Sequence, residues 1–246
     1  MKKALRWTLI LISFLLFMVG GILLVIFHPA WAYKHTTSYQ QFTILHEQEL
    51  DEPIFSIIDS SLSVLEKSEI YDPAVEVIWC LNDGSPYPGW IERLMGKDTF
   101  RAFSHFIVMQ GSFEGSVYSF QKFGQTLSIR QFLTHALVHN MQYAHHGFWD
   151  ANPLGGHPHW KWEGYAEYIS QENLPDPRKL NALVQKHQDP YTWIDMGKDQ
   201  KTIYLHIPFL AATTYCFENQ GMDYEVFMAD TTSLESILTK LSTENP

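Results

Sequence analysis

The sequence predicts an α+β protein that is tied to a membrane by one N-terminal helix. Three observations carry this prediction. An uncharged run of 20 residues, Thr8–Phe27, stands near the start of the chain. Short strand-like runs lie between residues 75 and 120, and helical periodicity dominates from residue 128 onward. Strands first and helices afterwards is the order typical of α+β folds.

The uncharged run is long enough to cross a bilayer as a helix. The basic residues Lys2, Lys3 and Arg6 precede it, so the positive-inside rule places the N-terminus in the cytoplasm and the rest of the chain outside. We therefore expect a cytoplasmic tip and signal-anchor helix in residues 1–33, with membrane contact through residues 8–27.

A cleaved signal peptide is the alternative for this segment. Ala30-Trp31-Ala32 resembles an A-x-A cleavage site, with the cut after Ala32. Against cleavage, the apolar run exceeds the length of about 7–15 residues that such peptides usually have. The length favours a retained anchor.

The composition indicates one folded extracytoplasmic domain in residues 34–246. Of all residues, 46% are hydrophobic and 15% aromatic, as in a packed protein. The net charge is −10 with only 17 Lys and Arg. Because phosphate contacts need a basic surface, we expect no nucleic-acid partner. Cys80 and Cys216 form no disulfide framework, so a single disulfide and two buried thiols both stay open.

The first half of the domain is predicted to begin with a linker and a helix and to continue in strands. Tyr33–Thr43 is polar and aromatic, as expected of a linker that leaves the membrane. Ile44–Ser68 carries apolar residues close to helical period. Val75–Leu81 is a candidate buried strand, and Ala102–Gln110 and Ser116–Phe120 are two more, with glycines in the turn between them.

The next helix is bounded by recognisable caps. Ser128 and Gln131 fit a capping box, and Gly147 fits the end of the helix. At about 100° per residue, His135 and His139 share one face of this helix. Further helices are predicted over Trp160–Glu172, from Asp176-Pro177, over Ile207–Asn219 before Gly221, and after a capping box at Thr232 and Glu235.

Two short motifs carry the chemistry. The stretch THALVHNMQ, residues 134–142, spaces two histidines one helical turn apart, and Gln142 falls on their face. Taken alone this is weak evidence, because six of the 12 histidines lie between His135 and His159. The stretch WKWEGYAEY, residues 160–168, follows after a short loop. An exposed acidic stripe is the plain alternative for its glutamates.

Together the motifs resemble the core of the gluzincin-type, MA-clan zinc metallopeptidases. Many of these carry L-x-H-E-x-x-H-x-x-Q and then W-x-x-E-G-x-A-E-Y. The resemblance covers about 40 residues, Phe132–Ser170. The matching residues are Leu133, His135, His139, Gln142, Trp160, Glu163, Gly164, Ala166, Glu167 and Tyr168.

The resemblance implies a zincin-like domain: a small antiparallel or mixed sheet, then a mostly helical half that carries the metal site. It implies one zinc ion on His135, His139 and Glu163, a set that leaves the fourth position open as in catalytic zinc sites. Glu167, with Gln142, would then support the liganding histidines. Gly164 would let the two helices approach closely.

The departure from the family pattern is Ala136, which stands where the family has its general-base glutamate. General acid–base help is worth about 10²–10⁴ in rate. The candidate substitutes are His157, His159, Tyr204 and His206. If the site is otherwise intact, Ala136→Glu is expected to raise peptidase activity by about 10² or more. His145 and His146 fit the end of the helix, where protonated histidine suits the helix dipole.

Three functions are compatible with these residues. The first, slightly favoured, is a pseudoenzyme of metallopeptidase fold that binds zinc with weak or no peptide hydrolysis. The second is an active zinc peptidase with a non-standard base. The third is a metal-free, membrane-tethered binding or structural domain. In the first two, a peptide or protein ligand is expected along a strand of Ala102–Phe120, because extended peptides add to open sheet edges.

Overall fold

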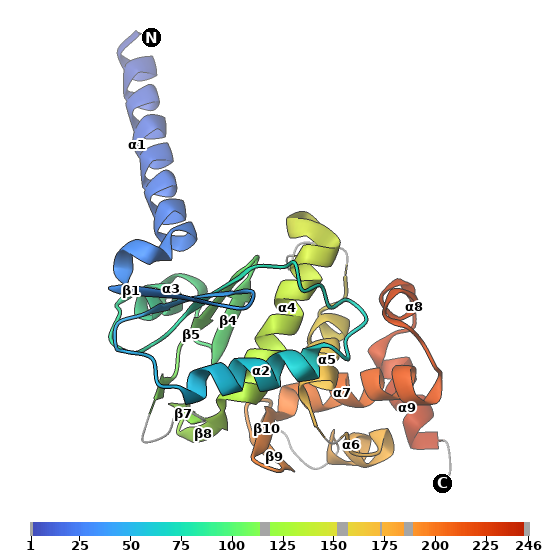
Figure 1. Cartoon of the computed structure of the whole chain (residues 1–246). Helices are drawn as coiled ribbons and strands as arrows, with labels where there is room; N and C mark the ends of the chain where they lie inside the picture. Colours follow the sequence, from blue (N-terminus) through green and yellow to red (C-terminus); the bar gives the residue numbers. More distant parts are fainter. Residues whose placement is uncertain (1, 114–118, 152–156, 173, 185–188, 244–246) are drawn as a thin grey trace.

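The computed structural model describes residues 2–113, 119–151, 157–172, 174–184 and 189–243. Figure 1 shows a long N-terminal helix, α1 (Lys2–Phe27), that projects from an α+β domain. Among the described residues, one helical segment is long and apolar enough to cross a membrane or to serve as a signal sequence, Arg6–Phe27, with a mean hydropathy of 3.1. A short 3₁₀ turn, Pro29–Ala32, joins it to the domain.

The main sheet has the strand order β1-β2-β3-β5-β4. The three central strands are parallel and the two outer strands run antiparallel to their neighbours. The sheet is therefore mixed. The strands are β1 (His35–Tyr39), β2 (Phe42–His46), β3 (Val77–Cys80), β4 (Phe100–Phe103) and β5 (Phe106–Met109).

The expectation of a linker over residues 33–43 and a helix from Ile44 was wrong. Residues 35–46 form the β1–β2 hairpin, and the helix begins only at Pro53 (α2, Pro53–Leu65). The reason lies in the burial of β2. Ile44 packs into the large core and Leu45 into a second apolar cluster on the other face of the sheet. A strand buried on both faces shows no alternation, so periodicity does not distinguish it from a helix.

The second cluster is covered by a helix that the sequence did not predict, α3 (Tyr87–Met95). Two prolines and a glycine in Pro86–Gly89 disguised it, although proline is tolerated in a first helical turn. The predicted strand Ala102–Gln110 is instead part of a hairpin, β4–β5, whose turn contains Ser104 at φ 52°. The predicted strand Val75–Leu81 is confirmed as β3.

A second, three-stranded sheet precedes the helical half. It contains β6 (Ser112–Phe113), β7 (Ser119–Lys122) and β8 (Gln125–Ser128). Of the predicted strand Ser116–Phe120, only the last two residues are described, and they begin β7. Part of the short loop expected between the two motifs, residues 152–156, lies outside the described residues.

The helical half agrees with the prediction except for the short helix Tyr224–Ala229, which was not predicted. The helices are α4 (Ile129–Asp150), α5 (His159–Ser170), α6 (Pro177–Val184), α7 (Ile207–Thr214) with a π-helical turn Tyr215–Asn219, α8 (Tyr224–Ala229) and α9 (Leu234–Thr243). The hairpin of β9 (Trp193–Gly197) and β10 (Gln200–Ile203) was not predicted. In Figure 1, α5 lies beside α4 and α7, and both contacts are extensive.

The caps differ from the prediction in detail. The Ser128 side chain caps the amide of Gln131 as expected, but the Gln131 side chain does not reach back. It donates to the carbonyl of Lys201 and accepts from the Lys201 amide instead. At Gly147 (φ 78°) α4 kinks and then continues to Asp150. Ser233, not Thr232, caps α9.

Two smaller expectations are also resolved. A Cβ atom on Gly164 would lie 2.3 Å from Thr213 Oγ1, so the close approach at this glycine is to α7 and not to the histidine helix. Cys80 and Cys216 are free and buried, which answers the question of a disulfide in favour of two thiols.

Candidate metal centre

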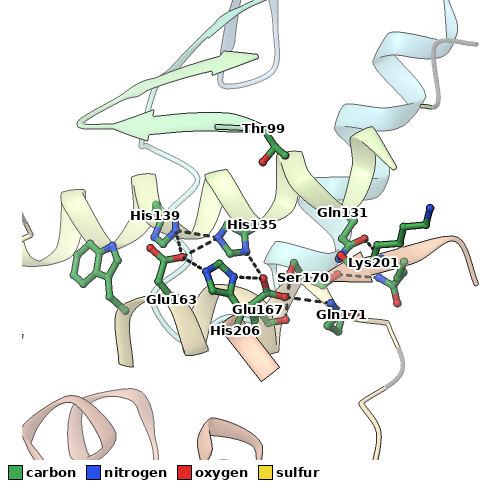
Figure 2. Close-up of polar contacts among 12 residues, drawn as sticks. Thr99, Gln131, His135, His139, Glu163, Glu167, Ser170, Gln171, Lys201 and His206 are labelled. Carbon is green, nitrogen blue, oxygen red and sulfur yellow. Dashed lines mark hydrogen bonds and ion pairs between the residues drawn. The ribbon is translucent and has the colours of Figure 1, made fainter. Parts of the chain in front are cut away.

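Two helices bring the three expected ligands together. His135 and His139 lie one turn apart on α4, and Glu163 faces them from α5 (Figure 2). Glu163 Oε2 lies 3.4 Å from His135 Nε2 and 3.5 Å from His139 Nε2, and the two nitrogens are 3.1 Å apart. One ligand atom from each residue lies within 4.8 Å of the others. The three donor atoms therefore converge on one point.

Hydrogen bonds behind the histidines determine which ring nitrogen faces this point. His139 Nδ1 lies 2.8 Å from Gln142 Oε1, and the amide nitrogen of Gln142 donates to the carbonyl of Trp162. Since Oε1 only accepts, this network assigns the proton of neutral His139 to Nδ1. His135 Nδ1 lies 3.7 Å from Glu167 Oε1, which favours the same tautomer. Glu167 and Gln142 thus lie where the resemblance placed them.

This assignment leaves acceptors facing acceptors. Both Nε2 atoms then carry lone pairs directed at each other and at a carboxylate oxygen. Three such acceptors repel one another unless a cation lies among them, either a metal ion or an added proton. Two imidazoles and one carboxylate at one turn's spacing are a fitting donor set for zinc.

Of the four candidate substitutes for the missing base, His206 is the one that faces Oε2 of Glu163, the oxygen directed at the two α4 histidines. Its Nδ1 lies 2.8 Å from Glu167 Oε1, its Nε2 lies 4.0 Å from Glu163 Oε2, and its ring is parallel to that of His135. It occupies the junction of the turn Tyr204–His206 with α7. One carboxylate, Glu167, therefore supports both His135 and His206.

The other three candidates are not directed at the ligand atoms of the centre. Tyr204 donates its hydroxyl hydrogen to the carbonyl of Val184, away from the centre. His159 Nε2 lies 3.7 Å from the outer oxygen of Glu163, with its side chain 67% exposed. His157 stacks on Trp162 and, like His159, lines a cavity beside the centre, which is described below. His157 and His159 are thus part of the cavity wall.

Mutual charge sets the protonation of the cluster. Burial alone would raise the pKa of Glu163, but the positive charge of protonated His139 and the contacts of Glu163 with both α4 histidines hold that pKa well below its ordinary value. Burial lowers the pKa of His139, yet Glu163 reverses this, and the net pKa is raised. In the same way Glu167 outweighs burial and raises the pKa of His206, while its own pKa is lowered. Neither glutamate belongs to an exposed acidic stripe.

The centre lies in the wall of a cavity of about 830 Å³. Residues of β4, α4, α5 and the β9–β10 hairpin line it. The open edge of the main sheet, formed by β4, is therefore beside the candidate metal ligands. This is the arrangement expected for an extended ligand along a strand of Ala102–Phe120.

Two cavity residues were not found from the sequence. Asp98, just before β4, forms an ion pair of 3.2 Å with Arg101, and both side chains line the cavity. Burial raises the pKa of Asp98, and Arg101 reverses this only in part. No local pattern marks this pair, because its relevance depends on β4 being the edge strand beside α4. Only the tertiary fold brings it to the site.

Ala136 does not have the surroundings expected of it. Its side chain is 1% exposed, belongs to the large apolar core, and is not part of the cavity wall. In the structure this position therefore does not open on the cavity. The face of α4 that turns to the cavity carries Phe132, His135, His139 and Tyr143 instead.

Comparisons of the chain with family models, with curated proteins and with solved structures found no match. The case for a function therefore rests on the geometry of this site.

Proposed function

We propose that this chain is a membrane-anchored zinc protein with a gluzincin-like fold, in which His135, His139 and Glu163 hold one zinc ion. The observation that carries the proposal is the convergence of His135 Nε2, His139 Nε2 and Glu163 Oε2, with Gln142 bonded behind His139 and Glu167 close behind His135. Zinc in such a set acts as a Lewis acid toward a carbonyl oxygen.

The ligand of the cavity is proposed to be an extended polypeptide that lies along β4. In the two-residue hairpin, Phe103 pairs with Phe106 and Arg101 with Val108. Alternation along an antiparallel pair then directs the backbone N–H and C=O groups of Phe100 and Ala102 to the open edge. A peptide strand added there would satisfy them and would pass beside the centre.

We favour binding with little or no hydrolysis, because α4 carries no carboxylate beside His135, and its one acidic residue that lines the cavity, Asp150, lies at the far end of the helix. The position that has a carboxylate in the family is an alanine packed in the core. A protein of this kind would hold a peptide segment and release it unchanged. The Asp98–Arg101 pair is available to recognise polar groups of that peptide.

A second function, slow hydrolysis, is favoured by one observation, the pair of His206 and Glu167. With its Nδ1 proton directed at Glu167, neutral His206 carries a free lone pair on Nε2, and that atom lies 4.0 Å from Glu163 Oε2. His206 can therefore accept a proton at the edge of the centre and return it, which is the task of a general base.

The metal is tested first. Full-length protein is purified in detergent, stripped with a chelator, dialysed against zinc and assayed by atomic emission. We expect about one zinc per chain. No zinc after this treatment would leave the metal-free binding domain as the remaining function. A peptide-library digest with wild type, His206→Ala and the exposed control His159→Ala then separates the two zinc functions: hydrolysis abolished by His206→Ala alone supports the slow enzyme.

The membrane topology is part of the same proposal. The N-terminus is placed in the cytoplasm and the domain outside, because of the basic residues before α1. A reporter fused after Pro246 should be active only outside the cytoplasm. A mature protein that begins at Tyr33 would instead establish a cleaved signal peptide.

A further inference from the structure

The last turn of α1 is docked onto the domain and not joined to it by a free linker. Tyr87 Oη, in the first turn of α3, donates to the carbonyl of Ile26 at 2.7 Å. The ring of Phe27 makes edge contacts of 6.3 and 6.0 Å with those of Phe103 and Phe106. Figure 1 shows α3 at the level where α1 meets the domain. The position of α3 relative to a membrane that contains α1 is therefore determined by where α1 ends.

Apolar side chains of α3 remain accessible beside its buried side. Tyr87, Pro88 and Ile91 face the domain. Trp90 and Leu94 lie one helical turn apart next to them; Trp90 is partly buried against the second cluster, and Leu94 is 49% exposed. The Trp90 ring stacks at 5.2 Å on Trp31, which is 56% exposed in the turn that follows α1.

These accessible apolar side chains are bordered by positive charge. Arg93 and Lys97 are exposed next to them, whereas the carboxylate of Glu92 is neutralised by Lys122 at 2.6 Å. In a chain of net charge −10, a local excess of positive charge is unusual. We name the whole surface the interfacial face; it consists of Trp31, Trp90, Arg93, Leu94, Met95 and Lys97.

We propose that the interfacial face lies in the headgroup layer of the bilayer that α1 enters and binds anionic phospholipids there. The proposal rests on α1 being retained in the membrane. Because Ile26 belongs to the last turn of α1, a group bonded to its carbonyl lies close to the edge of the hydrocarbon. Tryptophan prefers this depth, and exposed apolar side chains with flanking Lys and Arg are typical of helices that lie in the interface.

The alternative, a domain held clear of the lipid, requires a spacer between the anchor and the domain. The described residues provide none. Ser85 Oγ donates to the carbonyl of Ala32 at 2.8 Å, and Tyr33 Oη donates to that of Leu81 at 2.9 Å. The chain is thus bonded to the domain from the last turn of α1 onward. A rigid connection of this kind presents α3 to the bilayer in one orientation.

The test measures the depth of a spin label in the full-length chain. Leu94→Cys is labelled with a nitroxide and reconstituted in nanodiscs of phosphatidylcholine with phosphatidylglycerol. Both native cysteines are buried and do not compete for the reagent. Collisions with oxygen report lipid, and collisions with a water-soluble nickel chelate report water. Matched labels go on Leu15→Cys within α1 and on Thr239→Cys, exposed on α9.

We expect the label at position 94 to collide more with oxygen than with nickel, as at position 15, while position 239 behaves as in water. If position 15 reports lipid and position 94 reports water, the interfacial face is wrong and the anchor stands. If both report water, the face and the anchor fail together. Neither outcome bears on the zinc site, whose metal content is measured separately.

The lipid preference is tested by reversing charge. Arg93→Glu with Lys97→Glu should move the label at position 94 toward water in the anionic nanodiscs, by on the order of fivefold in accessibility ratio per charge removed. Arg178→Glu with Lys179→Glu on α6 makes the same change of net charge elsewhere and should leave the ratio unchanged. An equal shift in both double variants, or none in either, would overturn the binding of anionic lipid.

Discussion

The helix α4 carries two groups of histidines that differ in what faces them. The inner group, His135 and His139, faces the half-buried carboxylate of Glu163 and the buried one of Glu167. The outer group, His145 and His146, faces the rim of the domain. There His145 meets Glu225, whose side chain is 68% exposed, and His146 meets the hydroxyl of Tyr224.

One histidine of each group has a shifted pKa, and the two shifts have opposite signs. Glu163 raises the pKa of His139 against the effect of burial, whereas burial and the neighbouring histidines lower the pKa of His146. A cluster of histidines in the sequence therefore does not by itself distinguish a candidate metal site. What distinguishes it is a carboxylate buried opposite two imidazoles, with acceptors behind them that direct their lone pairs inward.

The largest expected difference between the groups is in zinc binding. His139→Ala removes a ligand and should abolish stoichiometric zinc, whereas His145→Ala, on the same helix, should leave about one zinc per chain. Atomic emission of both variants after the same dialysis makes the comparison. Retention of zinc by His139→Ala would mean that the metal sits elsewhere, with the outer group as the first place to look.

A charged side chain at position 136 of α4 would test whether this position lies in the core or reaches the cavity. Ala136→Glu places a carboxylate in the apolar core, and we expect a loss of about 3–5 kcal/mol in the free energy of unfolding. Ala136→Gln, of equal size and uncharged, should lose less. Thermal unfolding measures both. A stable Ala136→Glu protein with peptidase activity raised by about 10² would show that the side chain does reach the cavity, as the family pattern implies.

The next largest effect is expected from removing the charge of Glu167, which lies behind the liganding histidines. Glu167→Gln keeps the shape of the side chain but removes the charge that His135 and His206 share. Loss of such an outer partner typically weakens metal affinity by about 10–100-fold. Competition with a fluorescent zinc chelator measures the change. The matched variant Glu225→Gln in the outer group should bind zinc like the wild type.

The pH dependence has a sign that the pKa shifts determine. The raised pKa values of His139 and His206 stabilise the metal-free fold fully below about 6.5, and this contribution is lost as pH rises through the raised values. The lowered pKa values of both glutamates stabilise it above about 4.5, and that contribution is lost as pH falls through the lowered values. The stripped protein should therefore be most stabilised by the cluster between these limits.

Zinc competes with protons for the same histidine nitrogens. The affinity for zinc should therefore rise with pH. It should rise by about tenfold per pH unit for each proton displaced, up to the raised pKa of His139. Titrations with the zinc chelator at several pH values measure this. A zinc affinity that does not depend on pH between 6 and 8 would place the metal on groups other than these histidines.

The sequence predicted the inner group well because its members lie close in the chain. Two helices that follow one another, each with two site residues one turn apart, are visible in local patterns. His206 was only one of four candidates, and Asp98 and Arg101 were missed. These residues come from a turn before α7 and from the approach to β4, and no periodicity records that the fold brings them to α4.

The same limit explains the errors in the fold. The burial of β2 on both faces concealed the hairpin of β1 and β2, and prolines concealed α3. Both elements contribute apolar residues to the second cluster, which only the tertiary structure brings together. Helices α4, α5 and α7 were placed to within a few residues.

The smallest expected effect concerns the shortest contact in the comparison. His145 Nε2 lies only 2.5 Å from Glu225 Oε1, closer than any pair of ligand atoms in the inner group. Distance alone would rank it first. Both side chains are exposed, however, so water screens the charges and ordering the side chains costs entropy. We expect Glu225→Gln to change the free energy of unfolding by about 0–1 kcal/mol in chemical denaturation. His145→Gln should give the same value, because the two variants break one contact. A loss well above this range in either variant would mean that the outer group, too, holds its charges away from water, and the contrast between the two ends of α4 would have to be abandoned.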